Sequence, residues 1–427
     1  MFFLVINPLW PTYVGIKIGS LPILNFNRVI GLILVSVFLL NSLLSRAWLS
    51  QAIGRLTPVS KPIFVVFVFF IWRFISTVAS KDIVYSLFLV TLDFLLQFVV
   101  FIAVVISFDD LEVVKKAFKA ILISAVFVVL FGIVEHLFEK NIFTSLVPNS
   151  YKNVDFVASA IEEKVRDSYR VQVAFMHPLV LAEYLTIIIP IAGMFLLDKY
   201  SKFTRSYAFF VFIGGFYVLY STGSRSGVVV LIMQFLCFFF FYLMLKSQNE
   251  ISVKKIITGG SLFCISIFIG VFYGKDYIIG KGSAEVMSTA ARVLQLLNGI
   301  EAVYKKPIMG YGQGFSAEYI GVENISTGQL TVDNYYLNLV VESGVPAVVL
   351  FVVMILVFLR YALYINIINS LFDRMASICI FSLLMGFTVF SFILSNHEAF
   401  GVVFSIFGLI LVLYRISYYN VANNKCK

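Results

Sequence analysis

The feature that most constrains this chain is a succession of long apolar runs separated by short polar segments. A helix rises about 1.5 Å per residue, so about 20 apolar residues can cross the hydrocarbon core of a bilayer. We count about twelve such runs in the 427 residues, and Pro8 and Pro11 interrupt the first. The runs lie at residues 2–17, 28–45, 62–79, 83–107, 117–137, 173–197, 205–221, 226–245, 255–273, 335–363, 374–395 and 400–418.

The composition excludes a soluble protein. Hydrophobic residues make up 60% of the chain and charged residues 13%, whereas a soluble domain carries about 45–50% and about 25%. Lipid leaves every backbone group to be satisfied within the protein, so only helices or closed β-barrels can span it. No segment shows the alternation of a barrel strand. The sequence therefore predicts an all-α polytopic membrane protein with one domain, residues 1–427.

The basic residues divide unequally between two sets of short loops. The richer set carries Arg46, Arg55, Lys61, Lys115, Lys116, Lys119, Lys199, Lys202, Arg205, Lys246, Lys254, Lys255, Arg374, Arg415, Lys425 and Lys427. The other set carries little beyond Lys17, Lys81 and Arg225. Cytoplasmic loops are enriched in Lys and Arg, so the richer set and both termini are predicted to be cytoplasmic. The net charge of +9 is then an orientation signal and not a nucleic-acid surface.

Two longer loops, residues 138–172 and 274–334, fall on the extracytoplasmic side in this arrangement. Functional residues concentrate on such loops, so chemistry is expected there. The second loop contains an amphipathic helix that could lie on the membrane surface and that Ser288 or Thr289 could cap. Its apolar residues are Val293, Leu297, Ile300 and Tyr304. Arg292 would lie in the first turn, where the helix N-terminus and the guanidinium could together bind a phosphate.

Several further polar residues lie at or near the predicted outer ends of the spans. Arg225 lies at the membrane boundary, where it must either reach the interface or bind an anion. Arg170 and His177 precede another span and lie seven positions apart, and they are expected to share a face whether the segment is helical or extended. His177 would more often be a packed or capping residue than a base. Arg73 lies inside a span and needs a partner in the bundle.

The segment after the amphipathic helix combines turn residues with candidate binding residues. Pro307 would end the helix, and the following glycines would form a tight turn that presents Tyr311 and Phe315. Asp333 would either cap the tenth span or serve as a general base. Glu342 lies one to two turns deeper, where an ionisable group needs a purpose. The histidines and the four cysteines show no metal-ligand spacing, so no metal site is predicted.

Together these segments resemble the O-antigen ligase and polymerase superfamily, the Wzy and WaaL types, over roughly residues 165–350. The parts are the Arg170-to-Pro178 segment, the Thr222-to-Arg225 turn, Arg292 with its helix followed by Pro307 and Gly310-Tyr-Gly312, and Asp333-Asn334 followed after nine residues by Gly344. Ligases of this superfamily open the last motif with a histidine and carry a characteristic residue three positions after the glycine. Here Asp333 and Ala347 occupy those positions, which favours a polymerase.

The resemblance implies a GT-C-like glycosyltransferase of the bacterial cytoplasmic membrane, with its active site outside. Donor and acceptor would both be undecaprenyl-diphosphate-linked oligosaccharides, with no nucleotide sugar, metal or other cofactor. Arg225 and Arg292 would stabilise the leaving diphosphate, and Asp333 would accept the proton. The residues expected to bind substrate are Arg170, His177, Tyr311, Asn334 and Glu342. Whether a chain-length regulator also binds stays open.

Three alternatives remain beside the polymerase. A ligase would transfer the glycan to a lipid core acceptor. A flippase would move the lipid-linked unit and should carry charge along a central cavity, whereas the unusual charge here gathers at one face. A peptidoglycan-type glycosyltransferase of the shape-and-division class also pairs membrane helices with an outer-loop aspartate, but has fewer spans.

Overall fold

The computed structural model describes residues 2–16, 24–148, 157–158, 161, 168–197, 202–246, 283–323, 330–365, 371–395 and 400–425. The α-helices are α1 (Phe2–Ile6), α2 (Phe26–Leu44), α3 (Arg46–Leu56), α4 (Ser60–Ser76), α5 (Ile83–Asp93), α6 (Val100–Ser107), α7 (Leu111–Phe138), α9 (Pro178–Leu197), α10 (Lys202–Ser221), α11 (Arg225–Lys246), α14 (Ser283–Lys305), α15 (Ser316–Ile320), α16 (Tyr335–Tyr364), α17 (Leu371–Phe390) and α18 (Phe400–Lys425).

Short elements complete the described chain. Three 3₁₀ turns cover Thr57–Val59, Thr77–Ala79 and Ile142–Leu146, and a π-helix covers Phe94–Val99 between α5 and α6. Strands β1 (Gly15–Ile16) and β2 (Leu24–Asn25) pair antiparallel, as do β3 (Val322–Glu323) and β4 (Leu330–Thr331).

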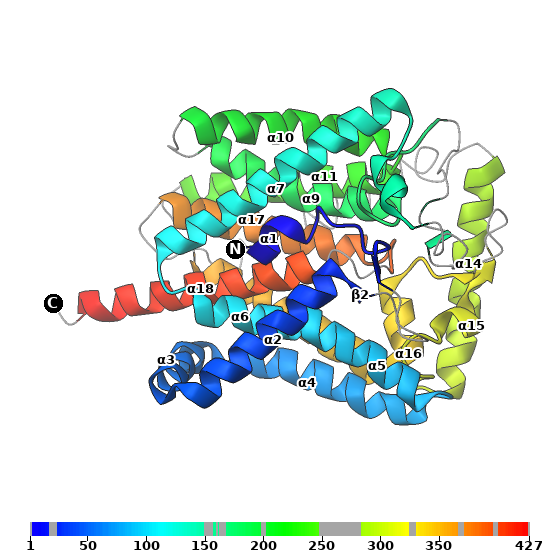
Figure 1. Ribbon diagram of the computed structural model, residues 1–427, viewed down its shortest axis with the longest axis horizontal. Helices are drawn as coiled ribbons and strands as arrows, with labels where there is room; N and C mark the ends of the chain where they lie inside the picture. The colour runs from blue at the N-terminus through cyan, green and yellow to red at the C-terminus, as the bar shows by residue number, and fades with distance from the viewer. Residues whose placement is uncertain are drawn as a thin grey trace.

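The long helices form one bundle, with α14 and α15 across one end and α3 and the C-terminus at the other (Figure 1). In the described residues, nine helical segments are long and apolar enough to cross a membrane, and Arg374–Phe390 is a shorter apolar helix. The nine are Phe26–Leu44, Arg46–Ala79, Ile83–Ser107, Leu111–Phe138, Pro178–Leu197, Lys202–Ser221, Arg225–Tyr242, Tyr335–Tyr364 and Phe400–Tyr419. The predicted all-α polytopic membrane fold is confirmed.

The prediction of a first span at residues 2–17 is wrong. Helix α1 ends at Ile6, and β1 begins at Gly15. Pro8 and Pro11 lack the backbone N–H that a continuing helix needs, so the helix stops before them. The predicted span at 255–273 lies outside the described residues, so the count of twelve is not confirmed.

Some of the basic residues predicted to be cytoplasmic lie at the end of the bundle opposite α14. Helix α3, which carries Arg46 and Arg55, lies there with the C-terminal part of α18 (Figure 1). Arg415 of α18 donates a hydrogen bond to the carbonyl oxygen of Arg55 at 2.8 Å. One basic end is what the orientation prediction requires; its assignment to the cytoplasm stays a prediction.

The centre of the bundle is built from helices that are apolar all round. Helices α9 and α18 are buried along most of their length, whereas α2 lies at the periphery and exposes most of its surface. Small residues bring neighbouring helices close: a Cβ atom added at Gly214 of α10 would lie 2.5 Å from Val129 of α7. Close backbone approach at glycine is typical of membrane helices, which gain contact energy from tight packing.

Helix α16 is broken near its start. Gly344 has φ 79° and ψ 174°, and Pro346 follows two residues later. Proline has no N–H to donate to the carbonyl four residues before it, here Glu342. The left-handed φ at Gly344 also removes the neighbouring helical bond to Val341. The break therefore leaves backbone acceptors that need other donors inside the bundle.

The glycine loop, which we define as residues 307–314, supplies these donors. The backbone N–H of Tyr311 donates to the carbonyl of Val341 at 2.8 Å, and that of Gly312 donates to the carbonyl of Glu342 at 2.9 Å. The loop is thus fixed to α16 by main-chain hydrogen bonds, as an added strand would be.

Replacing Gly344 with alanine should disrupt this junction. The new Cβ would lie 1.8 Å from the carbonyl oxygen of Ile308, in a backbone conformation that alanine avoids. We expect a loss of about 2 kcal/mol or more, measured as a lower unfolding midpoint in detergent. The matched control is Gly54→Ala in α3, where an added Cβ meets nothing within 4 Å. A midpoint unchanged in Gly344→Ala would contradict the described junction.

Candidate active site

Arg292 and Asp333 meet at the α14 end of the bundle. The Nε atom of Arg292 lies 3.5 Å from Oδ2 of Asp333, with side chains 44% and 31% exposed. Two predicted catalytic residues that are 41 positions apart in sequence (333 − 292) are therefore an ion pair. An exposed pair of this kind is held only weakly, so an anionic ligand can compete for the guanidinium.

Gln295 positions the aspartate and was missed in the sequence. Its Oε1 accepts a hydrogen bond from the backbone N–H of Asp333 at 3.1 Å, and its Nε2 donates to the carbonyl of Thr331 at 2.8 Å. Gln295 is buried and lies one helical turn from Arg292. The sequence could have indicated Gln295, because its amide lies on the face of the predicted amphipathic helix opposite to the apolar residues Val293 and Leu297.

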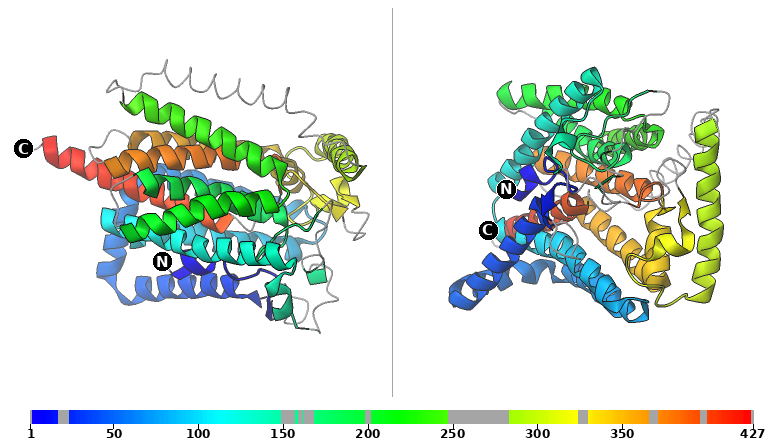
Figure 2. Two further views of the ribbon diagram at one scale, coloured as in Figure 1. Left: turned by 90° about the horizontal axis from the view of Figure 1, so that it is seen from above. Right: turned by 45° about the vertical axis from the view of Figure 1, so that its right-hand side comes forward.

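Helix α14 is amphipathic, as predicted, but it begins earlier. It starts at Ser283, so neither Ser288 nor Thr289 caps it, and Arg292 is its tenth residue. The predicted phosphate site that combined the helix N-terminus with Arg292 is therefore wrong. The stripe of Val293, Leu297, Ile300 and Tyr304 is exposed. Helix α14 crosses the end of the bundle (Figure 2). Its contact with a membrane surface stays a prediction.

The predicted helix cap at Asp333 is also wrong, because the adjacent Asn334 does this work. The Oδ1 atom of Asn334 accepts a hydrogen bond from the backbone N–H of Leu337 at 3.1 Å, at the start of α16. Asn334 thereby satisfies a donor that the first helical turn leaves open. The carboxylate of Asp333 lies beside Arg292 instead.

The glycine loop buries the two aromatic rings that we expected it to present. Tyr311 and Phe315 are both buried, and the Tyr311 ring lies 3.8 Å from that of Tyr319. The Tyr311 hydroxyl donates to the carbonyl of Ala302 in α14 at 3.2 Å. Tyr311 therefore joins the glycine loop to the helix that carries Arg292.

Glu342 is buried in α16 and holds the far end of the glycine loop. Its Oε1 accepts hydrogen bonds from the backbone N–H of Gly314 at 2.9 Å and from the Ser316 hydroxyl at 3.2 Å. The carboxylate of Glu342, an ionisable group for which we expected a role at this depth, therefore holds the backbone of the glycine loop in place.

A second group of predicted residues forms around Arg225. The Nε atom of Arg170 donates to the carbonyl of Thr222 at 2.7 Å, which joins two sequence motifs across 52 positions. Ser224 caps the start of α11 by accepting from the N–H of Gly227 at 3.1 Å. Arg225 is the first residue of α11 and is half-buried. The turn before Arg225 is thus held from both sides.

Glu135 anchors the segment that carries Arg170, and it too was missed in the sequence. Its two carboxylate oxygens accept from the N–H groups of Gln172 at 3.0 Å and Val173 at 2.8 Å, and from the Tyr169 hydroxyl at 3.0 Å. Glu135 is buried near the end of α7. A glutamate at the end of an apolar run was the only signal for it.

His177 has the capping role that its sequence context favours. Its Nδ1 atom accepts a hydrogen bond from the backbone N–H of Leu179 at 3.1 Å, at the start of α9. Residues 171–177 are irregular, and α9 begins at Pro178 rather than at residue 173. The prediction that Arg170 and His177 share a face was made for a helical or an extended segment, and the irregular backbone found here meets neither condition.

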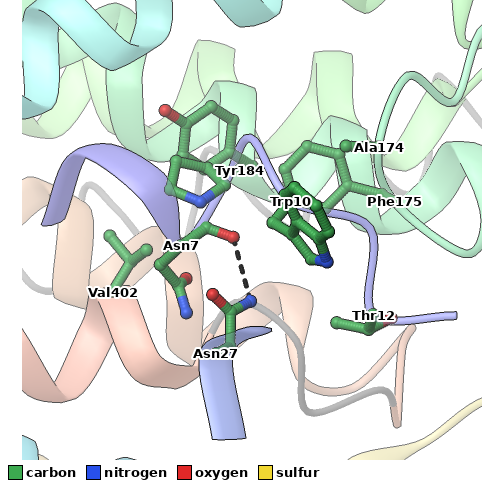
Figure 3. Close-up of a pocket in the computed structure, with 9 residues that line it drawn as sticks. Asn7, Trp10, Thr12, Asn27, Ala174, Phe175, Tyr184 and Val402 are labelled. Atoms are coloured by element: carbon green, nitrogen blue, oxygen red, sulfur yellow. Dashed lines mark hydrogen bonds between the residues drawn. The ribbon is translucent and has the colours of Figure 1, made fainter. Parts of the chain in front are cut away.

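Two other features lie apart from these groups. A small pocket, with room for about one water molecule, is lined by Asn7, Trp10, Thr12, Asn27 and Tyr184 among others, and Asn27 donates to the Asn7 carbonyl at 3.2 Å (Figure 3). None of the predicted site residues lines it. In the described part of the chain, no three His, Cys, Asp or Glu side chains gather in a way that could hold a metal.

Among the described side chains, the helix that carries Arg292 also has an ion pair on its exposed side. The Lys305 Nζ donates to Glu301 at 2.7 Å, one turn apart on α14. This hydrogen bond holds the pKa of Glu301 below its usual range and raises the pKa of Lys305. Both groups therefore stay charged in neutral solution, and the pair is a solvated contact within the helix.

If Asn334 acts as a helix cap, its effect should be on stability and should follow side-chain chemistry. We expect Asn334→Ala to lose about 1 kcal/mol, and Asn334→Ser to keep most of the stability because serine also caps. Unfolding midpoints of the two variants in detergent provide the test. Equal midpoints for Asn334→Ala and the unaltered protein would show that the cap contributes nothing.

A comparison with known families covers the segment that contains most of these groups. Residues 209–352 match the family model described as O-antigen ligase. The matched segment includes Arg225, Arg292, the glycine loop and Asp333. No curated protein matches the chain. The match confirms the resemblance predicted from the sequence: over residues 209–352 this membrane protein is similar to the O-antigen ligase family, within the superfamily of O-antigen ligases and polymerases.

Proposed function

We propose that this chain is a glycosyltransferase that polymerises a surface polysaccharide from undecaprenyl-diphosphate-linked repeat units at the outer face of the bacterial cytoplasmic membrane. The observation that carries the proposal is the Arg292–Asp333 pair, 3.5 Å apart at the α14 end of the bundle. Transfer from a lipid diphosphate to a hydroxyl needs a cation for the leaving group and a base for the proton. The family match over residues 209–352 supports the same reaction class.

In the proposed reaction, a hydroxyl oxygen on one lipid-linked unit attacks the anomeric carbon of the donor glycan. The bond from that carbon to the diphosphate oxygen breaks, and its electron pair stays on the diphosphate. The hydroxyl proton passes to the carboxylate of Asp333, which acts as general base. The products are a glycan longer by one transfer, still on its lipid, and a free polyprenyl diphosphate.

Arginines provide the positive charge for the leaving diphosphate in this proposal. A guanidinium presents a planar fork of N–H donors that fits phosphate oxygens in pairs. Arg292 is exposed enough to reach a ligand, and Arg225 lies at the start of α11, where the helix end also favours an anion. The arginines would thus take the place of a metal ion in the reaction.

The ion pair gives the site a simple order of events. Before the donor binds, Arg292 and Asp333 neutralise each other across 3.5 Å. A diphosphate carries more negative charge than one carboxylate and draws Arg292 toward itself. Asp333 is then released from Arg292 and can accept a hydrogen bond from the acceptor hydroxyl.

The residues that were predicted to bind substrate have structural roles in this proposal. Tyr311, Asn334 and Glu342 make hydrogen bonds within the protein that hold the glycine loop and the start of α16. Arg170 and His177 similarly hold the Arg225 turn and the start of α9. We propose that these five shape the site, with ligand contact concentrated on the arginines and Asp333.

Ligase activity is the second candidate, because the matching family model is described as O-antigen ligase. The polymerase is preferred because Asp333 stands where ligases carry a histidine. The two reactions share the donor and differ in the acceptor, which is a new lipid-linked unit in one case and a lipid core in the other.

Substitution of the charged residues tests the proposed chemistry. We expect Arg292→Ala, Arg225→Ala and Asp333→Asn each to lower polymer formation by about 100-fold or more, with normal amounts of membrane-inserted protein. Arg292→Lys should also be poor, because a point charge lacks the bidentate fork. The matched control is Arg360→Ala, which removes an exposed arginine far along α16. Polymer retained in both Arg225→Ala and Arg292→Ala would exclude the diphosphate role.

Glycan profiling of a strain that lacks this gene distinguishes the candidate reactions. Surface glycan limited to a single repeat unit is the result expected for a polymerase. Full-length polymer retained on the lipid carrier would establish the ligase instead. Lipid-linked single units trapped on the cytoplasmic side would establish a flippase and overturn both enzyme proposals.

A further inference from the structure

A buried ionic group joins the glycine loop to the N-terminal helices. The Nη2 atom of Arg73 in α4 donates to Oδ2 of Asp93 in α5 at 2.6 Å and to Oε1 of Gln313 at 2.5 Å. Arg73 is 1% exposed and Asp93 17%. We call these three residues the Arg73 cluster. Asp93 is the partner in the bundle that a buried arginine requires.

Gln313 is the residue on which the cluster converges. Its Nε2 atom donates to Asp93 at 3.4 Å, and its carbonyl accepts from the Ser86 hydroxyl at 2.8 Å. Gln313 belongs to the segment that matches the O-antigen ligase family, whereas Arg73 and Asp93 lie outside it. Residues of the unmatched N-terminal part therefore hold a loop of the matched part.

The glycine loop transmits this contact to the proposed active site. On one side Gln313 is held by Arg73 and Asp93. On the other side the Tyr311 hydroxyl bonds to Ala302 of α14, the helix that carries Arg292. The backbone of the loop is fixed to α16, whose cap residue Asn334 follows Asp333 directly. The loop thus touches both elements that present the ion pair.

Burying the charges of the Arg73 cluster costs free energy, which argues that the cluster does more than fill space in the core. The Nε and Nη1 atoms of Arg73 have no hydrogen-bond partner among the described residues. An ion pair buried in a bundle is often no more stable than apolar side chains of the same volume. A π-helix, which is frequent at functional sites, begins directly after Asp93 at Phe94. Charge at this place is therefore better explained by the geometry it imposes than by stability.

We propose that Arg73 and Asp93 are positioning residues, which set the Arg292–Asp333 pair through Gln313 and the glycine loop. This inference rests on the proposed function for its catalytic consequence. Its structural part, that the cluster fixes the loop, stands separately and can be measured without any assay of activity.

Hydrogen exchange tests the structural part on the full chain in detergent. In Arg73→Gln and in Asp93→Asn, peptides covering residues 307–316 should exchange at least about tenfold faster than in the unaltered protein. The double variant should recover part of this protection, because neither charge of the Arg73–Asp93 pair is then left facing an uncharged partner. The matched control is Arg55→Gln, at the opposite end of the bundle. It breaks the ion pair between Nη2 of Arg55 and Oδ2 of Asp109, which are 2.5 Å apart. Unchanged exchange of residues 307–316 in both single variants would overturn the inference.

Polymer formation per folded molecule tests the catalytic part. We expect Arg73→Gln to reduce it about tenfold or more, the double variant to recover part of it, and Arg55→Gln to leave it unchanged. Faster loop exchange with full polymer formation would overturn the positioning role. If the unaltered protein makes no polymer, the proposed function fails while the exchange result still decides whether the cluster holds the loop.

Discussion

The break in α16 is the constraint on which the described active-site region depends. Gly344 and Pro346 interrupt a helix inside the bundle, and the carbonyls that the break frees belong to the buried residues Val341 and Glu342. The glycine loop satisfies them, and it can do so only by lying against α16. Once the loop is fixed there, Tyr311 reaches α14 and Gln313 reaches the Arg73 cluster. The break in α16 thus determines where α16, α14, α4 and α5 meet around the glycine loop.

Two groups of charged residues differ in their exposure and in how they are held. The half-exposed Arg292 and Asp333 form a long, weak pair that a ligand can open. The buried groups are held by several hydrogen bonds, as Glu135 is by two backbone N–H groups and a hydroxyl. The residues proposed to react are therefore partly exposed, and residues that support the proposed site are buried.

Sequence reasoning found the residues of the candidate site but assigned several of their roles to the wrong neighbour. Asp333 was expected to cap a span, yet Asn334 caps it, because either side chain fits a cap and only backbone geometry selects between them. Arg292 was expected in the first turn of its helix, whereas the helix begins nine residues before it, at Ser283. Gln295 and Glu135 were missed, since a single amide or carboxylate in an apolar run carries no pattern.

The sequence by itself determined the membrane fold, because long runs of apolar residues without the alternation of a barrel strand form helices in lipid, where every backbone group must be satisfied within the protein. It also identified Arg225, Arg292 and Asp333, because the motifs that contain them stand in the order and spacing that resemble the superfamily. Only the tertiary structure decided which of them meet. Arg73 contacts Gln313 across 240 positions and Arg170 contacts Thr222 across 52. Such contacts follow from the packing of whole helices, and no local pattern of residues encodes them.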